Sequence, residues 1–491
     1  MLIDLAVRTP NLPDTPFDVC ILGGGVAGIA LADKLASFGR RVLLVEAGPR
    51  QPDAASQRNY QGELGGLENL PLHETRLRGL GGSSNHWGGW CRQRDASDFR
   101  RSDFSPDGTW PIARSDLDPY FGEAARVLDV TQVSGADLAL RGSSAELKTI
   151  RMLFSAPPAR LGDKYFDRLA KSERILVLLN AACVSADFDE SVTAVKSVSV
   201  RNSKSSAPTV LRARQFVLAM GAIENVRNLL VLNGRLGNRI GNTGGLVGRF
   251  YMQSLHQKLG EFVLFGKSGV GHSGTTTDSL LAFMSSTDKY IDRTGRGAFR
   301  IYSTELTCSG IVDEYRKTLI GANCEPVSMG GNVFITAEHI PNAMSRILLT
   351  SAHDDLGQPR VKLDWRISEL DRATLRNAAV EFGRYLINAR IGRFKINPAI
   401  LSGSEPLAGW TKLAGAAGAA GHQMGGTRMS ATARDGVVDR NCRVWGISNL
   451  YVAGSSVFRT SGHATPTLTI VQLALRLAVA LHGILLQPPS R

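Results

Sequence analysis

The first organised pattern in the chain is an apolar run at Phe17–Leu22, which is typical of a buried parallel strand. A glycine-rich turn at 23–28 follows it. Apolar residues then recur at helical spacing up to Gly39, where the helix is expected to end. A second buried strand is predicted at Arg41–Glu46. The order of strand, glycine-rich turn, helix and strand indicates a nucleotide-binding unit.

Two later stretches have the pattern of strands that return to the same sheet. Ile175–Val184 and Gln215–Ala222 are largely apolar, and the second leads into a helix from Glu224. Near the end of the chain, Asn449–Gly454 is again a strand pattern closed by glycine. A further helix is expected to begin near Pro466, because proline suits the first turn of a helix.

The chain changes character between about residues 250 and 400. Short apolar runs there are typical of antiparallel strands, and a long helix is predicted at Ser368–Arg390. A polar, glycine-rich stretch at 266–277 is expected to form a loop, and the small-residue tract at 414–421 a flexible crossover. The predicted strands are Glu261–Phe265, Phe299–Tyr302 and Asn332–Thr336.

These patterns predict an α/β protein with two domains. One is a Rossmann-type nucleotide-binding domain at 14–245, to which the chain returns at 425–487. The other, at 246–424, is a substrate domain with a mixed, largely antiparallel sheet and helices.

Composition and charge exclude several classes of protein. The chain has 491 residues, of which 43% are hydrophobic and 21% charged, so disordered, collagen-like and disulfide-scaffold classes are excluded. The net charge of +13 leaves a nucleic-acid-binding protein as one hypothesis. The basic residues are scattered and no helix-turn-helix, zinc-finger or RNP-type signature occurs, so no nucleic-acid partner is expected.

The sequence also bears on the cellular compartment. The six cysteines form no CxxC motif or zinc-ligand spacing, so no metal site is expected and a reducing compartment is favoured. No secretory signal is visible, and we expect a cytoplasmic protein. Leu468–Leu486 approaches the length of a membrane span but contains Gln472, Arg476 and His482, so a buried helix is expected there.

The first glycine-rich turn has the spacing that phosphate binding requires. Gly23 permits the tight turn, Gly25 lets the backbone approach a pyrophosphate, and Gly28 allows the helix to pack on the sheet. The helix N-terminus offers free N–H groups to the phosphates. Glu46, at the end of the next strand, can accept hydrogen bonds from ribose hydroxyls. The alternative is a glycine-rich turn that binds no ligand.

Four segments together resemble the glucose–methanol–choline (GMC) family of flavin oxidoreductases. They are the first glycine motif with Glu46, the Gly-Gly-Ser-Ser-Asn-His-Trp loop at 81–87, the segment His422–Met429, and the block Val437–Thr469. Their order matches the family, and they are spread over nearly the whole chain. Within it they are most similar to the bacterial fructose dehydrogenase and pyranose oxidase branches. The resemblance implies FAD as the cofactor and oxidation of an alcohol.

Alcohol oxidation by hydride transfer needs a base for the hydroxyl proton beside the flavin ring, and histidine suits that role. His422 stands where the family has its catalytic histidine, followed by Gln-Met-Gly-Gly-Thr. The resemblance therefore implies that His422 is the catalytic base. A lone histidine without this motif would more often be structural.

The second catalytic position departs from the family pattern. Family members usually place Asn or His before the Pro-x-x-Thr that opens the last helix, whereas this chain has Thr465. A threonine hydroxyl can hydrogen-bond a substrate but cannot act as a base. His463 is therefore a second candidate, with a structural role as its alternative. The amides of Thr467 and Leu468 could stabilise negative charge on a reduced flavin.

His86 occupies the loop in which pyranose oxidase and choline oxidase attach FAD covalently. A covalent link through His86 is one possibility, and packing or a hydrogen bond against the ring is the other. The residues expected to contact FAD are Gly23, Gly25, Gly28, Glu46, Gly82, Ser83, Asn85, His86, Trp87, Val184, Gly221, Gly454, Ser455, Pro466 and Thr467.

The prediction is an FAD-dependent alcohol oxidase or dehydrogenase that oxidises a CH–OH group of a sugar or glycoside. Its partners are then a small-molecule substrate and oxygen or another electron acceptor. Because Thr465 replaces the expected Asn, the alternative is a flavoenzyme of specialised metabolism with the same fold. Such an enzyme would act on a non-sugar substrate, in either a redox or a non-redox reaction.

Overall fold

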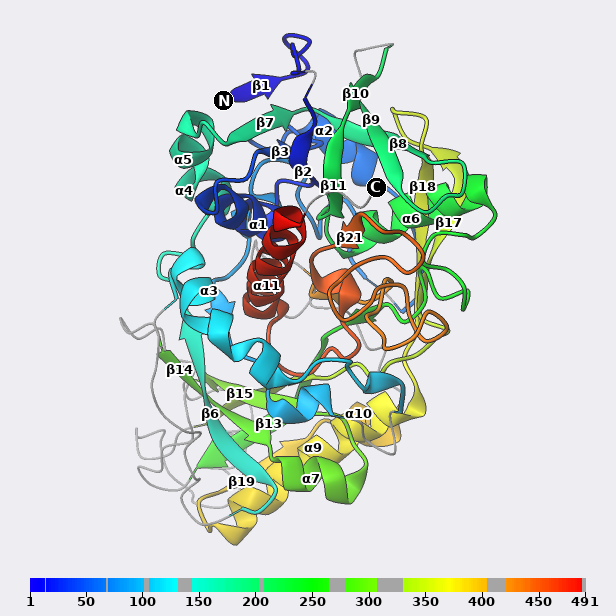
Figure 1. Cartoon of the computed structure of the whole chain (residues 1–491). Helices are drawn as coiled ribbons and strands as arrows, with labels where there is room; N and C mark the ends of the chain where they lie inside the picture. Colours follow the sequence, from blue (N-terminus) through cyan, green and yellow to red (C-terminus); the bar gives the residue numbers. More distant parts are fainter. Residues whose placement is uncertain are drawn as a thin grey trace.

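The computed structural model describes residues 1–13, 15–67, 69–100, 106–130, 144–202, 207–264, 280–306, 330–403 and 421–487. The stretch predicted as a loop at 266–277 lies outside the described residues, as does the small-residue tract at 414–421 apart from Gly421. Two larger sheets organise the described part, in the upper and lower halves of Figure 1.

A six-stranded parallel sheet forms the nucleotide-binding half, with the order β1-β7-β3-β2-β11-β21. The helix α1 (Val26–Ser37), which follows the glycine turn, packs against the C-terminal helix α11 (Pro466–Leu486). The predicted βαβ unit and α/β class are therefore confirmed. The strands are β1 Leu2–Asp4, β2 Phe17–Leu22, β3 Val42–Val45, β7 Ile175–Leu179, β11 Ala213–Leu218 and β21 Leu450–Val452.

The stretch predicted as one strand at Ile175–Val184 forms two strands instead. After β7, the strand β8 (Ala182–Phe188) joins a separate antiparallel sheet with β9 (Val195–Arg201) and β10 (Thr209–Leu211). Asn180, between β7 and β8, has a φ of 53°. A residue in this left-handed region turns the chain out of a strand, so the apolar run is divided at that point.

A seven-stranded antiparallel sheet forms the other half, in the lower part of Figure 1. Its order is β19-β13-β16-β15-β14-β6-β5. The helix α9 (Glu369–Asn388) packs against it, and Ser368 caps α9 by accepting a hydrogen bond from the Asp371 amide. The strands are β5 Trp90–Cys91, β6 Leu147–Phe154, β13 Leu255–Leu264, β14 Leu280–Ser286, β15 Phe299–Leu306, β16 Gly330–Ala337 and β19 Gly392–Ile396.

The two halves interleave along the chain. β5 and β6 precede residue 245, yet they extend the antiparallel sheet. β4 (Glu63–Gly66) likewise pairs with β18 (Pro359–Trp365), whose other neighbour is β17 (Arg346–His353). The domain boundaries at 245 and 424 remain predictions. The remaining described α-helices are α2 Ala54–Gln57, α3 Phe121–Val127, α4 Leu161–Lys164, α5 Phe166–Lys171, α6 Ala222–Leu236, α7 Asp288–Thr294 and α10 Pro398–Ser402.

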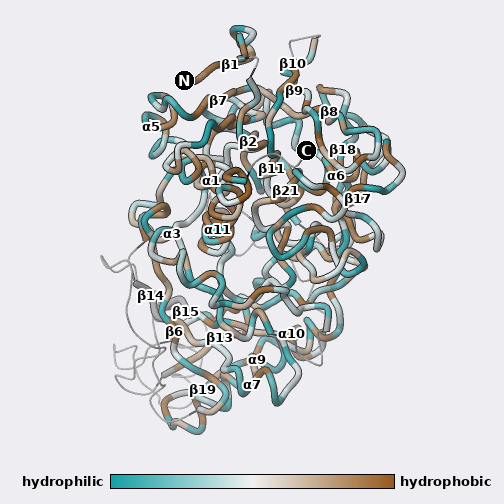
Figure 2. The backbone as a smooth tube through the Cα atoms, viewed as in Figure 1, coloured by the Kyte–Doolittle hydropathy of each residue, from teal (hydrophilic) through white to brown (hydrophobic). Residues whose placement is uncertain are grey.

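Buried apolar side chains form one large cluster around the parallel sheet and another between the antiparallel sheet and α9. Figure 2 shows α11 as one of the most hydrophobic stretches of the tube. By length and composition α11 could cross a membrane. Most of its apolar residues are buried inside this fold, where α11 contacts α1 and α3.

Candidate active site

A cavity of about 440 Å³ runs between the two halves of the molecule. At one end it is lined by residues at the carboxyl ends of β2, β3, β11 and β21, which include Gly23, Glu46, Gly221 and Gly454. Ligands of open α/β sheets bind at this edge. At the other end the lining includes His422. One cavity therefore joins the nucleotide motif to the predicted base.

The glycine turn has the backbone geometry that its sequence predicts. Gly23 has a φ of +117°, and a Cβ on it would lie 2.4 Å from the Ala219 carbonyl oxygen. A Cβ on Gly28 would lie 1.9 Å from the Gly23 oxygen. A Cβ on Gly25 would meet only Gly82 Cα, at 4.0 Å, so the backbone there is open to a ligand. These residues fit the pyrophosphate of FAD.

Glu46 is held in place by the backbone on both sides. Its Oε2 accepts a hydrogen bond from the Gly24 amide and its Oε1 one from the Gly48 amide, both at 2.8 Å. Burial raises the pKa of Glu46, and these amides and the charge of Arg78 oppose that rise. Each carboxylate oxygen has a second lone pair, so Glu46 can still accept hydrogen bonds from ribose hydroxyls of FAD.

The second glycine-rich loop begins with a short 3-10 helix, Gly82–Asn85. Ser83 and Trp87 line the cavity, and Trp87 Nε1 donates to the Ala159 carbonyl at 2.7 Å. Asn85 does not line it; its side chain donates to the Leu80 carbonyl at 2.9 Å. Of the other residues expected to contact FAD, Gly25, Gly82, Ser455, Pro466 and Thr467 line the cavity, whereas Gly28 and Val184 do not.

His86 lies beside this cavity without being one of its lining residues. Its Nε2 is buried and has no hydrogen-bond partner among the described residues. Burial, together with the charge of Arg160, lowers the pKa of His86 to about 4. The imidazole is therefore neutral at physiological pH.

His422 owes its position to a two-stranded ladder. β12 (Met252–Gln253) pairs antiparallel with β20 (Gln423–Met424), with Gln253 opposite Gln423. The next residues outward are Ser254 and His422, and Ser254 Oγ lies 3.2 Å from His422 Nδ1. Burial and the charge of Arg300 lower the pKa of His422 to about 3. His422 is therefore uncharged, which is the state a proton acceptor needs.

Polar side chains cross the antiparallel sheet in one row next to His422. Thr336 lies opposite His256 on one side and Arg300 on the other, and Arg300 lies opposite Ser285. Directly opposed residues of antiparallel strands share a face. All four side chains are buried, and the His256 ring lies 6.1 Å from the ring of His422.

Thr465 and His463 occupy different surroundings. Thr465 lines the cavity, and its hydroxyl donates to the Trp90 carbonyl at 2.8 Å. His463 is 1% exposed and does not line the cavity. Its Nε2 lies 3.1 Å from Asp95 Oδ2 and 3.3 Å from Ser285 Oγ. Burial alone would raise the pKa of Asp95, but the hydrogen bond with His463 and nearby cationic charge hold it well below its usual range.

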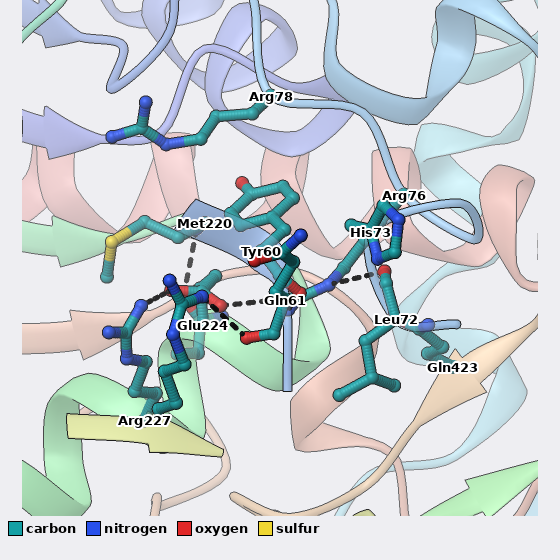
Figure 3. Close-up of polar contacts among 12 residues, drawn as sticks. Tyr60, Gln61, Leu72, His73, Arg76, Arg78, Met220, Glu224, Arg227 and Gln423 are labelled. Atoms are coloured by element: carbon teal, nitrogen blue, oxygen red, sulfur yellow. Dashed lines mark hydrogen bonds and ion pairs between the residues drawn. The ribbon is translucent and has the colours of Figure 1, made fainter. Parts of the chain in front are cut away.

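A buried ion network lines the cavity nearer the nucleotide end (Figure 3). Arg76 Nη1 lies 2.6 Å from Glu224 Oε1, and Arg227 Nη1 lies 3.2 Å from Glu224 Oε2. Arg227 also contacts Asp354 at 2.7 Å. Arg76 stacks its guanidinium over the Tyr60 ring at 4.1 Å. The network ties α6 to the loop before the second glycine motif and to the β17–β18 connection.

Several residues of the site were missed in the sequence. Ser254 and His256 lie beside His422, and Arg300 lies two strands away from His256 in the antiparallel sheet. The signal for Arg300 was a single arginine between Phe299 and Ile301 in an apolar strand. The Arg76–Glu224 pair joins residues 148 positions apart and had no local signal.

Comparisons with family models match two parts of the chain. Residues 18–232 match the FAD dependent oxidoreductase model, and residues 341–474 match the GMC oxidoreductase C-terminal model.

Named relatives extend the match to nearly the whole chain. Paromamine 6'-oxidase of Streptomyces fradiae is 27% identical, over 96% of this chain and 92% of that protein. The fructose dehydrogenase large subunit of Gluconobacter japonicus is 23% identical, over 94% and 97%. The 2-methyl-1,2-propanediol dehydrogenase of Mycolicibacterium austroafricanum is 23% identical, over 94% of each.

Solved structures share the fold. Pyridoxine 4-oxidase from Mesorbium loti superposes with a TM-score of 0.56 at 18% identity, covering 95% of this chain and 99% of that one. Formate oxidase of Aspergillus oryzae gives a TM-score of 0.55 at 15% identity, covering 96% and 99%. At these identities the likeness establishes the fold alone.

Proposed function

This chain is an FAD-dependent oxidoreductase of the GMC type, and we propose that it oxidises a hydroxyl group of a sugar or glycoside. The observation that carries the proposal is the placement of His422, neutral and half-buried, in the cavity that the nucleotide motif opens into. Names of relatives support the substrate class, because they refer to fructose, paromamine and a diol.

His422 takes the hydroxyl proton in this proposal. In the tautomer whose Nδ1–H donates to Ser254 Oγ, the ring lone pair lies on Nε2, which is the atom that accepts the proton. FAD held at the glycine turn and Glu46 would supply the acceptor for the hydride of the carbon that bears this hydroxyl. The substrate loses one proton and one hydride, so the CH–OH group becomes a carbonyl.

Two further elements support this chemistry. The first-turn amides of α11, at Thr467 and Leu468, have no intrahelical partners and carry partial positive charge. They suit negative charge on the reduced cofactor. The hydroxyl proton of Thr465 is committed to the Trp90 carbonyl, so Thr465 Oγ1 acts toward a substrate as a hydrogen-bond acceptor.

The test is anaerobic mixing of the FAD-loaded protein with a panel of sugars, glycosides and simple alcohols, read as bleaching of the flavin absorption. His422→Ala should retain FAD and lose reduction by about 10²- to 10⁴-fold. The matched control is His353→Ala, at an exposed position at the end of β17. Undiminished reduction in His422→Ala would refute the proposal.

The same experiment separates the alternatives. A flavin bleached only by non-sugar alcohols would favour a specialised-metabolism substrate. A product of unchanged oxidation state would select a non-redox reaction. Admitting air after reduction then tests oxygen against another acceptor.

Non-covalent binding of FAD completes the proposal. It is supported by the place of His86 outside the residues that line the cavity. The neutral Nε2 of His86 has the protonation state that a covalent bond would need, so the alternative has its own chemical support. Acid precipitation of the protein decides between the two modes of attachment. Flavin in the supernatant supports non-covalent binding. Flavin in the pellet of the native protein, but not in the pellet of His86→Ala, refutes non-covalent binding.

A further inference from the structure

The cavity contains a buried arginine whose charge the proposed hydride transfer does not use. Arg300 is 2% exposed and lines the cavity together with His422 and Thr465. Its Nη1 donates to the His463 carbonyl at 3.0 Å and lies 3.8 Å from Met152 Sδ. Within the described part of the chain, Nε has no hydrogen-bond partner, and the group whose charge opposes the lowering of the pKa of Arg300 by burial is the Tyr302 phenol, not a carboxylate.

The other three arginines among the described lining residues have acidic neighbours. Arg76 and Arg227 pair with Glu224, and Arg78 lies near enough to Glu46 to lower its pKa. A buried charge is costly unless it is paired. Arg300 is therefore the lining arginine for which a bound ligand can supply the negative charge.

We propose that Arg300 binds a carboxylate of the substrate, so that the substrate class is an acidic sugar or acidic glycoside. This inference rests on the proposed hydroxyl oxidation in the same cavity. A guanidinium presents two parallel N–H groups that match the two oxygens of a carboxylate. One arginine supplies a single positive charge, which matches a carboxylate more closely than a phosphate of about −1.5 to −2.

The place of Arg300 beside the base gives an independent reason for an anion. Its charge lowers the pKa of His422, in addition to the effect of burial. When His422 accepts a proton, two cations would face one another. A carboxylate bound to Arg300 offsets this repulsion, so an acidic substrate restores the proton affinity that the base needs.

The reduced cofactor is a less suitable partner for Arg300, since the first-turn amides of α11 already supply positive potential at the cavity. The net charge of +13 also favours the approach of an anionic substrate.

The experiment compares three glycosides that differ only at C6: a methyl glycoside, its uronic acid and its 6-phosphate, in the glucose, galactose and mannose series. Two readouts are taken with the FAD-loaded protein, anaerobic flavin reduction and equilibrium binding measured by perturbation of the oxidised flavin spectrum. We expect the uronic acid to exceed the neutral glycoside in kcat/KM by about 10- to 100-fold, the range of one charge-assisted hydrogen-bond pair.

Substitutions at Arg300 test the assignment of that preference. Arg300→Gln should reduce it to near unity, mainly through KM and the dissociation constant, and Arg300→Lys should restore part of it. Arg384→Gln removes the same charge from an exposed position on α9 and should leave the preference unchanged. Retained FAD absorption identifies the variants that fold. The preference of the native protein for the uronic acid over the neutral glycoside tests the proposal without any variant.

The outcomes distinguish failure of the anion site from failure of the proposed hydroxyl oxidation. Uronic acid that binds through Arg300 without reducing the flavin supports the anion site and refutes hydroxyl oxidation. Neutral glycosides that reduce the flavin as well as the acids refute the anion site and leave hydroxyl oxidation standing. A higher kcat/KM for the 6-phosphate than for the uronic acid refutes the assignment of a carboxylate as the ligand of Arg300. An unchanged preference in Arg300→Gln, with a lowered flavin potential, would assign Arg300 to the cofactor instead.

Discussion

The hydroxyl of Ser254 lies 3.2 Å from Nδ1 of His422 because Ser254 directly follows β12 and His422 directly precedes β20, the strand with which β12 pairs antiparallel. Ser254 is 1% exposed, and its position is set by backbone pairing rather than by chance packing. The contact places Nδ1 of His422 against a hydroxyl, and Nε2 is the nitrogen to which the proposal assigns the proton. Ser254 is thus a positioning residue for the proposed base.

Ser254→Ala should slow flavin reduction about tenfold, the equivalent of one hydrogen bond. Without the serine, the ring orientation and tautomer of His422 lose the hydrogen bond that Ser254 provides. The loss should appear in kcat rather than in KM, measured by anaerobic stopped-flow reduction. Ser191→Ala, at an exposed position after β8, is the control. Equal rates for the two variants would contradict a positioning role.

The stability of the protein should depend on pH through His422. In the folded state its pKa is about 3, and in the unfolded chain it returns to about 6.5. As pH falls from 6.5 toward 3, the unfolded chain binds a proton that the folded state does not, so the free energy of unfolding falls. The slope for one such histidine is at most about 1.4 kcal/mol per pH unit.

Urea unfolding of the native protein and of His422→Gln, each at several pH values from 7.5 to 4.5, measures this dependence. The variant should lose part of the decline at low pH. His353→Gln, which alters an exposed residue, should follow the native curve. Parallel curves for His422→Gln and the native protein would show that His422 is not held neutral.

The Arg76–Glu224–Arg227 network should contribute to stability and to cofactor retention. Glu224→Gln removes the carboxylate charge that pairs with the buried guanidinium groups of Arg76 and Arg227. The free energy of unfolding should therefore fall by about 3 kcal/mol. FAD should also dissociate more readily, because the network lines its cavity. Urea unfolding and flavin release on dilution measure the two effects.

Asp167→Asn makes the same chemical change at an ion pair whose two side chains are each 78% exposed. Its effect should stay within about 0.5 kcal/mol. A similar loss of unfolding free energy in Glu224→Gln and Asp167→Asn would mean that burial of the network does not increase its contribution to stability.

The sequence predicted those features that depend on neighbouring residues. The strand, glycine turn, helix and strand at the N-terminus are contiguous, and each has its own periodicity, so they were confirmed as β2, α1 and β3. The same holds for α9 and α11, whose starts are marked by a serine cap and a proline.

The sequence did not predict what depends on strand register. His256, Thr336 and Arg300 meet in one row only because β13, β16 and β15 pair as they do. Nor did any local pattern assign β5 and β6 to the antiparallel sheet, because sheet membership is decided by tertiary packing. The division of Ile175–Val184 depends on the backbone of Asn180, a residue that adopts the left-handed region more readily than most.

Thr465 joins the start of α11 to β5 through its 2.8 Å hydrogen bond to the Trp90 carbonyl. Thr465→Val should cost about 1 kcal/mol of unfolding free energy, because that carbonyl loses its donor. It should also raise KM, since the acceptor for a substrate hydroxyl is removed from the cavity. Thr465→Ser keeps the hydroxyl and should change neither the unfolding free energy nor KM by more than a small fraction.

Thr465→Asn installs the residue that the family pattern has, and its flavin should be reduced by the same class of substrate. If Thr465→Val binds and turns over substrate like the native protein, Thr465 acts only in anchoring the helix, and substrate recognition at this end of the cavity falls to His422 and Arg300.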